Sequence, residues 1–341
     1  MKYAILIYPH QNKRYFDAIK PLCMNELTIM TKSFEKNISN IHYNDIGGLE
    51  LLFFEADTLS GREIRILNSM SNNQAIFEIK DDVYLKPIKE NKKYYVKEDL
   101  SSILKYKGKT NESFTDMMIN VGIFSSDFYN QFDGPLHILD PMCGKGTTLY
   151  QGLIKGYNVS GIEIDKKDIE EAINFLKRYF EYHHYKHNSE SAASIVHSGI
   201  KCGIRYLFET ADSVENYKAK DRRKIELVIG NTVDTGLIYL EKETFHSIIT
   251  DLPYGVQHAG INNEKLVNMQ TLLVASIKGW YSVLKKGGTV VIAYNTYTFK
   301  RAALEEILIE SGLQVIKEKP YDNFEHWVEQ AVNRDIIVAR K

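Results

Sequence analysis

Apolar residues in the second half of the chain follow two different periods. Residues 166–182 carry apolar side chains at steps of three and four, the spacing of one helical face, at Ile169, Ala172, Ile173, Leu176 and Phe180. Residues 289–294 form instead a short apolar run, as in a buried strand of a parallel sheet. Further strand-like runs occur at 159–164, 225–229, 245–249, 313–318 and 335–339, and further helical patterns at 148–155, 266–284 and 301–311. This half is predicted to be an α/β domain.

The first 90 or so residues have a different and shorter pattern. Pro21 is expected to kink or restart the first helix. Ser60 with Glu63 predicts a capping box at the start of the second helix. The order β-α-β-α-β-β is compatible with a small ferredoxin-like α+β module. Its strands are expected at 3–8, 49–55, 74–80 and 83–88, and its helices at 13–31 and 60–70.

Residues 137–165 read as strand, glycine turn, helix, strand and acid. The pair Asp140-Pro141 ends the first strand, because proline cannot donate to the next ladder position. Residues 143–147 (CGKGT) form the turn, where glycines allow a ligand to approach the backbone closely. Glu163 ends the second strand, and Asp165 is expected to be the N-cap of the next helix. This arrangement is typical of nucleoside binding, with the carboxylate on the ribose hydroxyls.

Several interpretations of this turn compete. A dinucleotide fold requires G-x-G-x-x-G, and the third glycine is missing. A P-loop requires a glycine where Leu139 stands, and here Gly146 follows the lysine. A pocket for S-adenosylmethionine (SAM) is the third interpretation. A βαβ unit with a merely structural glycine turn is the fourth.

Residues 250–255 (TDLPYG) follow another strand-like run and favour the SAM pocket. The Asp251 carboxylate and the Leu252 carbonyl can both accept hydrogen bonds from a planar NH2 group. Pro253 rigidifies the turn, and Tyr254 offers a face on which a base can stack. Alone, this segment could be an ordinary β-turn. After a SAM-like turn, it predicts a site that acts on an exocyclic amine.

The motifs DPMCGKGT and TDLPYG together resemble the class I SAM-dependent methyltransferases that modify amino groups. More narrowly, they are similar to the THUMP-associated guanine-N2 methyltransferases of tRNA. The resemblance covers roughly residues 110–341. Lys145 departs from it, since the family usually has a small residue there, and the lysine should point to solvent or to a carboxylate.

The resemblance implies a Rossmann-like, seven-stranded sheet with one antiparallel strand near its edge, preceded by a ferredoxin-like or THUMP-like module that holds tRNA. The expected domains are 1–108 and 109–341. SAM is the implied cofactor, and RNA is the implied partner. The catalytic residues are expected to be Asp251, Leu252, Pro253 and Tyr254. The residues expected to bind SAM are Asp140, Pro141, Cys143, Gly144, Gly146, Thr147, Glu163, Ile164 and Asn231.

Other residues have more than one interpretation. Asn231 could accept the adenine amine of SAM or only cap a loop. Phe114 and Thr115 could lie near SAM or belong to a plain packing helix at 109–124. His326-Trp327 is expected in a loop before the last strand, and Cys143 is not a candidate nucleophile. Residues 183–224 read as a long connection, whose histidines lack partners at metal-ligand spacing.

Composition excludes some classes of protein. Hydrophobic residues make up 44% of the chain, yet no run approaches the ~20 apolar residues that span a bilayer. Three widely spaced cysteines favour a reducing, cytoplasmic location. Because the net charge is −1, an RNA substrate would need a local basic patch. Residues 86–109, with eight lysines and interleaved tyrosines, and residues 218–224 could supply it or could be solvated surface.

The sequence therefore predicts a SAM-dependent methyltransferase that acts on the N2 amine of a guanosine in tRNA. A DNA adenine-N6 methyltransferase would use the same chemistry. A protein glutamine methyltransferase is a further alternative, since an amide NH2 fits the same acceptors. An inactive SAM-binding scaffold that presents RNA is the alternative from a different class.

Overall fold

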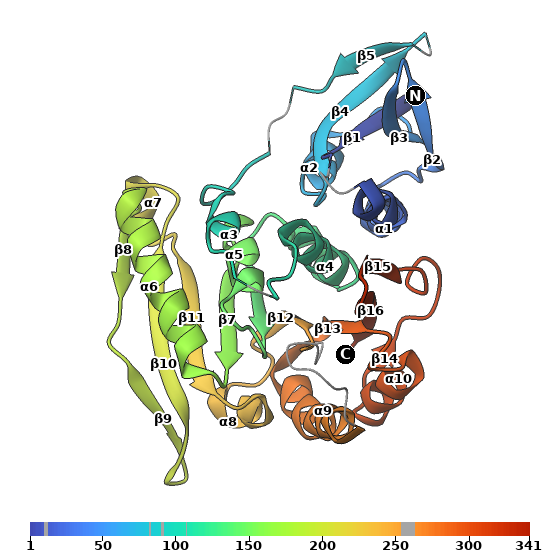
Figure 1. The fold of residues 1–341 in the computed structure, drawn as a ribbon. Helices are drawn as coiled ribbons and strands as arrows, with labels where there is room; N and C mark the ends of the chain where they lie inside the picture. Colours follow the sequence, from blue (N-terminus) through green and yellow to red (C-terminus); the bar gives the residue numbers. More distant parts are fainter. Residues whose placement is uncertain (10–12, 82, 90–91, 107, 254–262) are drawn as a thin grey trace.

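The computed structural model describes residues 1–341 apart from 10–12, 82, 90–91, 107 and 254–262. Two sheets organise these residues, one of five strands and one of eleven (Figure 1). The small sheet is formed by the N-terminal part of the chain, and the large one by the rest. None of the described helices is long and apolar enough to cross a membrane.

The N-terminal part is ferredoxin-like. Its elements are β1 (Lys2–Ile7), α1 (Lys13–Thr31), β2 (Ser39–Ile46), β3 (Leu49–Glu55), α2 (Gly61–Asn68), β4 (Asn73–Lys80) and β5 (Tyr84–Pro87). The strand order is β2-β3-β1-β4-β5, and every pairing is antiparallel. The sequence analysis missed β2, because its polar residues leave it with no buried position. With β2 included, the chain follows the β-α-β-β-α-β order of this fold plus one edge strand.

Local signals in this part agree with the structure at α2, and at α1 one of the two expected effects of Pro21 is excluded. The Ser60 side chain accepts a hydrogen bond from the Glu63 N–H, and the Glu63 carboxylate accepts from the Ser60 N–H at 2.7 Å. This is the predicted capping box. Pro21 lies inside α1 and does not divide it into two helices.

The large sheet contains the expected seven strands. They are β6 (His137–Asp140), β7 (Asn158–Glu163), β11 (Arg223–Gly230), β12 (Phe245–Asp251), β13 (Leu284–Asn295), β14 (Gln314–Val315) and β16 (Val332–Arg340). Their order is β14-β16-β13-β12-β6-β7-β11. The five from β13 to β11 are parallel, and β16 runs antiparallel between β13 and β14. The prediction of one antiparallel strand near the edge is confirmed.

Four more strands extend this sheet and correct two expectations. Residues 183–224 are not a long connection, because they contain β8 (His187–Ser189), β9 (Ala193–His197), β10 (Ile200–Thr210) and α7 (Val214–Lys218). β10 pairs antiparallel with β11 along eight residues and carries β8 and β9 on its other edge. His326-Trp327 does not lie in a loop, because it begins β15 (His326–Glu329), which pairs with β16.

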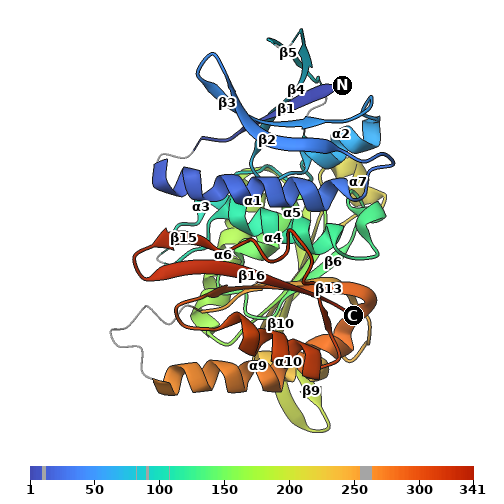
Figure 2. The same ribbon diagram turned by 90° about the vertical axis from the view of Figure 1, so that its right-hand side faces the viewer.

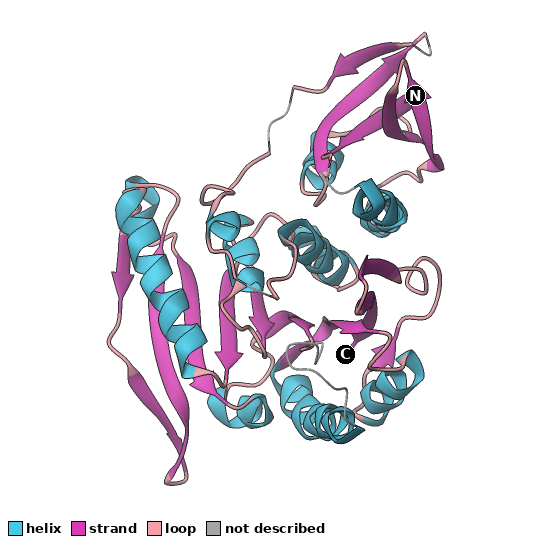
Figure 3. Cartoon of the chain, in the orientation of Figure 1, coloured by secondary structure: helices cyan, strands magenta, loops and turns pink. Residues whose placement is uncertain are grey.

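Helices cover both faces of the large sheet (Figures 1 and 3). One face carries α4 (Glu112–Phe124), α5 (Thr147–Ile154) and α6 (Lys166–Tyr182). The other carries α8 (Thr235–Ile238), α9 (Asn263–Val283) and α10 (Arg301–Glu310). This is the layer architecture of a Rossmann-like domain.

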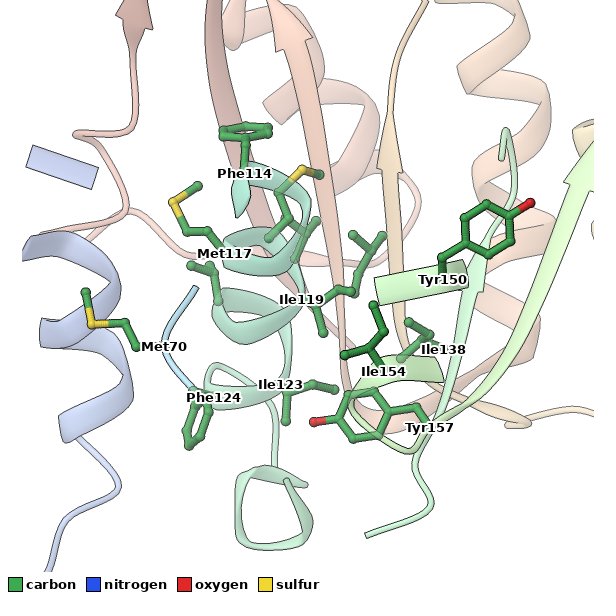
Figure 4. Packing of buried hydrophobic residues seen from close by; sticks show 14 of the residues in the cluster. Met70, Phe114, Met117, Ile119, Ile123, Phe124, Ile138, Tyr150, Ile154 and Tyr157 are labelled. Atoms are coloured by element: carbon green, nitrogen blue, oxygen red, sulfur yellow. The ribbon is translucent and has the colours of Figure 1, made fainter. Parts of the chain in front are cut away.

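One hydrophobic cluster contains residues of both parts of the chain, and each sheet also has a cluster of its own. The helix α1 lies across α4 (Figure 2), so α4 is covered by the large sheet on one side and by the N-terminal part on the other. Met70, which follows α2, belongs to the same hydrophobic cluster as Met117 and Phe124 of α4 (Figure 4). The short helix α3 (Leu100–Ile103) lies in the connection between the two parts. The predicted boundary between residues 108 and 109 stays a prediction.

Candidate active site

A cavity of about 760 Å³ lies at the carboxyl ends of the parallel strands of the large sheet. Ligands of open α/β sheets bind at this edge, where the strand order reverses. From β6 the chain first adds β7 and β11 on one side of β6. It then returns to add β12 and β13 on the other side, so the strand order reverses between β6 and β12. The cavity brings together ten of the predicted site residues: Asp140, Pro141, Cys143, Gly144, Thr147, Glu163, Ile164, Asn231, Asp251 and Pro253.

Three predicted residues are not part of this lining. Gly146 is the N-cap of α5, with φ +92°, and the Tyr150 ring would lie 3.2 Å from a Cβ at this position. Glycine is therefore required there for backbone and packing reasons. Leu252 is buried, and its N–H donates to the Ala293 carbonyl at 2.9 Å. Tyr254, like the loop predicted from residue 256 onward, lies outside the described residues.

The glycine turn holds the Glu163 carboxylate in place. The Gly144 N–H donates to Oε2 of Glu163, and the Asp165 N–H donates to Oε1, both at 2.9 Å. Gly144 has φ +51°, which favours glycine. A carboxylate has about four acceptor positions, so two remain for hydroxyl groups of a ligand. Asp165 is also the N-cap of α6, as predicted.

Asp140 and Cys143 lie deeper, at the end of β6 and in the turn. Burial raises the pKa of Asp140 to about 7, and hydrogen bonds from the Thr148 side chain and the Met142 N–H oppose this shift. Burial also raises the pKa of the Cys143 thiol. A buried, protonated thiol is a weak nucleophile.

Ile164 and Asn231 lie on the cavity wall beyond Glu163. The Ile164 side chain is 70% exposed and lines the cavity, so it offers an apolar surface to a flat ring. The Asn231 side chain accepts from the Val233 N–H at 3.1 Å and caps a short 3-10 helix. The capping alternative for Asn231 is therefore realised, in a residue that also lines the cavity.

Sequence reasoning missed residues from distant parts of the chain that line the cavity or lie close to Asp251. The Thr110 hydroxyl donates to Oδ2 of Asp251 at 2.5 Å, and Nη2 of Arg334 lies 4.0 Å from the same oxygen. The Tyr106 hydroxyl is 3.0 Å from the Thr147 hydroxyl. No local pattern marks these residues, because each is a single side chain in an ordinary segment. Met118, Thr148, Asp168 and Leu272 also line the cavity.

Two open questions from the sequence are resolved. Lys145 points to carboxylates: it pairs with Glu171 and lies 3.7 Å from Asp168. Thr115 lines the cavity. Phe114 packs instead against His326, with ring centroids 5.2 Å apart.

Some residues of the lysine-rich segment 86–109 make contacts inside the chain. Lys92 donates to the Met70 carbonyl, and burial lowers its pKa. The Tyr95 hydroxyl donates to the Asp221 carbonyl at 3.2 Å, and Lys109 pairs with Glu112. Lys92 therefore contacts the N-terminal part and Tyr95 the part that carries the large sheet. The expected RNA contact of this segment stays a prediction.

Comparison with known proteins gives a family match over residues 131–320, to UPF0020, described as RMKL-like, methyltransferase domain. No curated protein matches in sequence. Among solved structures, the chain is similar to TrmN from Thermus thermophilus, with 10% identity and a TM-score of 0.45 over 100% of this chain and 99% of that one. It is also similar to the rRNA methyltransferase aviRa from Streptomyces viridochromogenes (13% identity, TM-score 0.38, 71% of this chain and 91% of that one). A TehB-like SAM-dependent methyltransferase from Corynebacterium glutamicum has 13% identity and a TM-score of 0.35, over 60% of this chain and 80% of that one.

The family match spans more than half of the chain and includes the glycine turn, Glu163 and Asp251. The structural similarities are too low to carry the assignment, which rests on this match. The chain therefore belongs to the RMKL-like methyltransferase domain family and is a SAM-dependent methyltransferase.

Proposed function

We propose that this protein methylates the exocyclic N2 amine of a guanosine in tRNA. The observation that carries the proposal is the position of Asp251, which lines the same cavity as the glycine turn and Glu163. A carboxylate at the end of one strand thus faces the space in which a nucleoside would be held by the neighbouring strands. The TDLPYG motif, which resembles that of guanine-N2 methyltransferases, supports the choice of amine.

The residues of the cavity fit SAM. The volume is within the range of ordinary small-molecule sites, roughly 300–1,000 Å³. Glu163 would accept from the ribose hydroxyls, Ile164 would contact the adenine ring, and Asn231 would lie near the adenine amine. Asp140, Pro141, Cys143, Gly144 and Thr147 would line the methionine part, and Gly146 would shape the turn. When bound, SAM supplies a methyl group on a positively charged sulfur.

Asp251 and Leu252 would orient the target amine. The N–H of Leu252 donates to the Ala293 carbonyl of β13, so the peptide group between Asp251 and Leu252, next to the Leu252 carbonyl, is fixed to the sheet. The lone pair of an exocyclic amine is conjugated with its ring and is therefore a poor nucleophile. Two acceptors on the N–H bonds favour a pyramidal nitrogen whose lone pair points at the methyl carbon.

Methyl transfer to the amine releases one proton, which an acceptor in the site must take. As the new N–C bond forms, the nitrogen becomes positively charged and must lose a proton, which Asp251 can take. Pro253 is exposed beside the cavity and would keep the turn rigid. Tyr254 would stack on the base, a role proposed from the sequence alone.

The N-terminal ferredoxin-like part would hold the tRNA. Its contact with α4 is direct, and α4 also packs on β12, which ends in Asp251. RNA bound to this part would therefore be held at a defined position relative to the cavity. Phosphate contacts would come from lysines of this part and of the segment that follows it.

Methyl transfer from labelled SAM, followed by nucleoside mass spectrometry, tests the proposal. Unmodified tRNA, total DNA and a protein extract serve as parallel substrates. We expect N2-methylguanosine in the tRNA. Label found as N6-methyladenine in DNA or as methylglutamine in protein would contradict the proposed substrate, and SAM binding without any transfer would point to a scaffold.

Substitution of Asp251 tests the chemistry. Asp251→Ala is expected to lower kcat about a hundredfold or more, because the acceptor that orients the amine is lost. Binding of S-adenosylhomocysteine should change little. Asp322→Ala is the matched control, since Asp322 is exposed and does not line the cavity. Full activity of Asp251→Ala would end the assignment of this carboxylate.

A further inference from the structure

Two side chains from separate parts of the chain reach the carboxylate of Asp251. Thr110 precedes α4, and its hydroxyl donates to Oδ2 at 2.5 Å. Arg334 lies on β16, and its Nη2 is 4.0 Å from the same oxygen. A hydroxyl donor and a guanidinium therefore act together on one oxygen of the carboxylate.

Arg334 is held rigidly. Its side chain is only 4% exposed, and its guanidinium carbon lies 4.4 Å from the centroid of the Phe114 ring. On the sheet it is opposite Asn295 of β13 and His326 of β15. A buried guanidinium is unfavourable unless charges and hydrogen bonds compensate it. Asp251, on the wall of the cavity, supplies such a charge.

Thr110 is fixed in a different way. Asn111, the next residue, is the N-cap of α4 and accepts from the Phe114 N–H at 3.1 Å. Gly108 and Tyr106 line the cavity with Thr110, and Tyr106 is held by the Thr147 hydroxyl at 3.0 Å. The Thr110 hydroxyl therefore belongs to a segment that is fixed both to α4 and to the glycine turn.

We propose that Thr110 and Arg334 are positioning residues that hold the Asp251 carboxylate in the orientation in which it accepts the target amine. The proposal rests on the proposed function. An aspartate carboxylate rotates freely about its last torsion unless partners hold it. Methyl transfer requires the nitrogen lone pair to point at the methyl carbon, so a rotated carboxylate would present the amine at the wrong angle.

Kinetics of single and double variants test the proposal, with unmodified tRNA as substrate. Thr110→Val and Arg334→Gln are expected to lower kcat about tenfold or more, with KM for tRNA changed less than about threefold. Thr110→Ser should restore kcat, because it keeps the hydroxyl. In an Asp251→Asn background, neither substitution should lower kcat much further, because the carboxylate they hold is gone.

Arg301→Gln is the control for loss of a partly buried arginine that pairs with a carboxylate. Arg301 pairs with Asp335 of β16 at 2.8 Å and does not line the cavity. The Arg301→Gln substitution should lower the urea midpoint of unfolding and leave kcat unchanged. If Arg334→Gln fails to fold, the pair Thr110→Val and Thr110→Ser still decides the question.

Wild-type kcat in both Thr110→Val and Arg334→Gln would overturn the proposal. A wild-type protein that is inactive on tRNA would contradict the proposed function instead. In that case, a double-mutant cycle on the urea midpoints of unfolding tests the contacts with Asp251 without any enzymatic assay. It uses Thr110→Val, Arg334→Gln and the combination of each with Asp251→Asn. Non-additive shifts support the proposal, and additive shifts overturn it.

Discussion

The carboxyl group of Asp140 is buried at the end of β6 and carries a pH dependence. Its pKa is raised to about 7, above the ordinary value of an aspartate. Between about pH 4 and pH 7 the folded protein therefore holds a proton that the unfolded chain has lost. The contribution of Asp140 to the free energy of unfolding falls as the pH rises through this window. Above pH 7 the unfavourable contribution is complete.

Asp140→Asn should remove this dependence. The difference in unfolding free energy, variant minus wild type, is expected to be more positive at pH 8 than at pH 5, by roughly 2–3 kcal/mol. Urea denaturation followed by circular dichroism at both pH values measures it. Asp322→Asn, at an exposed position, is the control. An equal difference at the two pH values would show that the pKa of Asp140 is not raised.

Glu163 offers a direct test of the proposed cofactor contact. Glu163→Ala removes the carboxylate that the Gly144 and Asp165 N–H groups orient. We expect the Kd for S-adenosylhomocysteine to rise about tenfold or more, the effect of losing a charged hydrogen-bond acceptor. Calorimetric titration measures this. The control is Glu170→Ala on α6, which removes a half-exposed acid paired with Lys166 and should bind S-adenosylhomocysteine normally. Equal affinities of the wild type, Glu163→Ala and Glu170→Ala would exclude Glu163 from the site.

At the scale of elements, the contact of α5 with β6 and β7 depends on Gly152. A Cβ there would lie 2.6 Å from Cδ1 of Ile138 and 2.7 Å from Cγ1 of Val159. In a solvent-exposed helix, replacing glycine by alanine stabilises by about 1 kcal/mol. Here the methyl group would push α5 away from the strands. Because α5 begins at the glycine turn, the turn would be displaced with it.

Gly152→Ala is therefore expected to lower the free energy of unfolding by about 1–3 kcal/mol. Denaturation midpoints measure the change. Gly61→Ala is a suitable comparison, since Gly61 is exposed at the start of α2 and its Cβ would meet only Arg65 Nη1, at 3.9 Å. That variant should be neutral or slightly more stable. A stabilised Gly152→Ala protein would mean that the strands can move aside at little cost.

At the scale of the whole molecule, one buried polar cluster ties the N-terminal part to the methyltransferase sheet. Glu26 of α1 is fully buried and accepts from the Ser71 N–H at 3.0 Å and from Nδ2 of Asn120 at 2.6 Å. Asn120 belongs to α4 and also donates to the Ser69 carbonyl at 2.8 Å. Burial raises the pKa of Glu26, and these donors oppose the shift.

Loss of Asn120 should loosen this connection. Asn120→Ala leaves the buried Glu26 with one donor fewer, so the free energy of unfolding is expected to fall by about 1–3 kcal/mol. Limited proteolysis should also cut sooner near residues 88–111, which join the two parts. Glu26→Gln, which keeps the size of the side chain and removes its charge, is expected to lower the free energy of unfolding by less than Asn120→Ala does. Wild-type stability and protease resistance in Asn120→Ala would show that the apolar contacts alone join the parts.

Short motifs by themselves determined the centre of the site. The glycine turn, Glu163 and Asp251 were recognisable because each lies at the end of a strand, and parallel strands bring their ends to one edge. The ten predicted residues on the cavity wall follow from this local order. The capping box of α2 and the cap of α6 were recognisable for the same reason, since their partners are neighbours in the chain.

Contacts between distant segments were decided only by the tertiary structure. Thr110 lies 141 residues from Asp251, and no pattern connects them until α4 packs on β12. Arg334 reaches the same carboxylate because β16 inserts beside β13. β2 escaped detection because pairing with β3, and not an apolar pattern of its own, makes it a strand. β10 was missed although Ile200, Cys202, Ile204, Tyr206 and Phe208 alternate along it. Sequence determines what forms locally, whereas the packing of helices on the sheet decides which distant side chains meet.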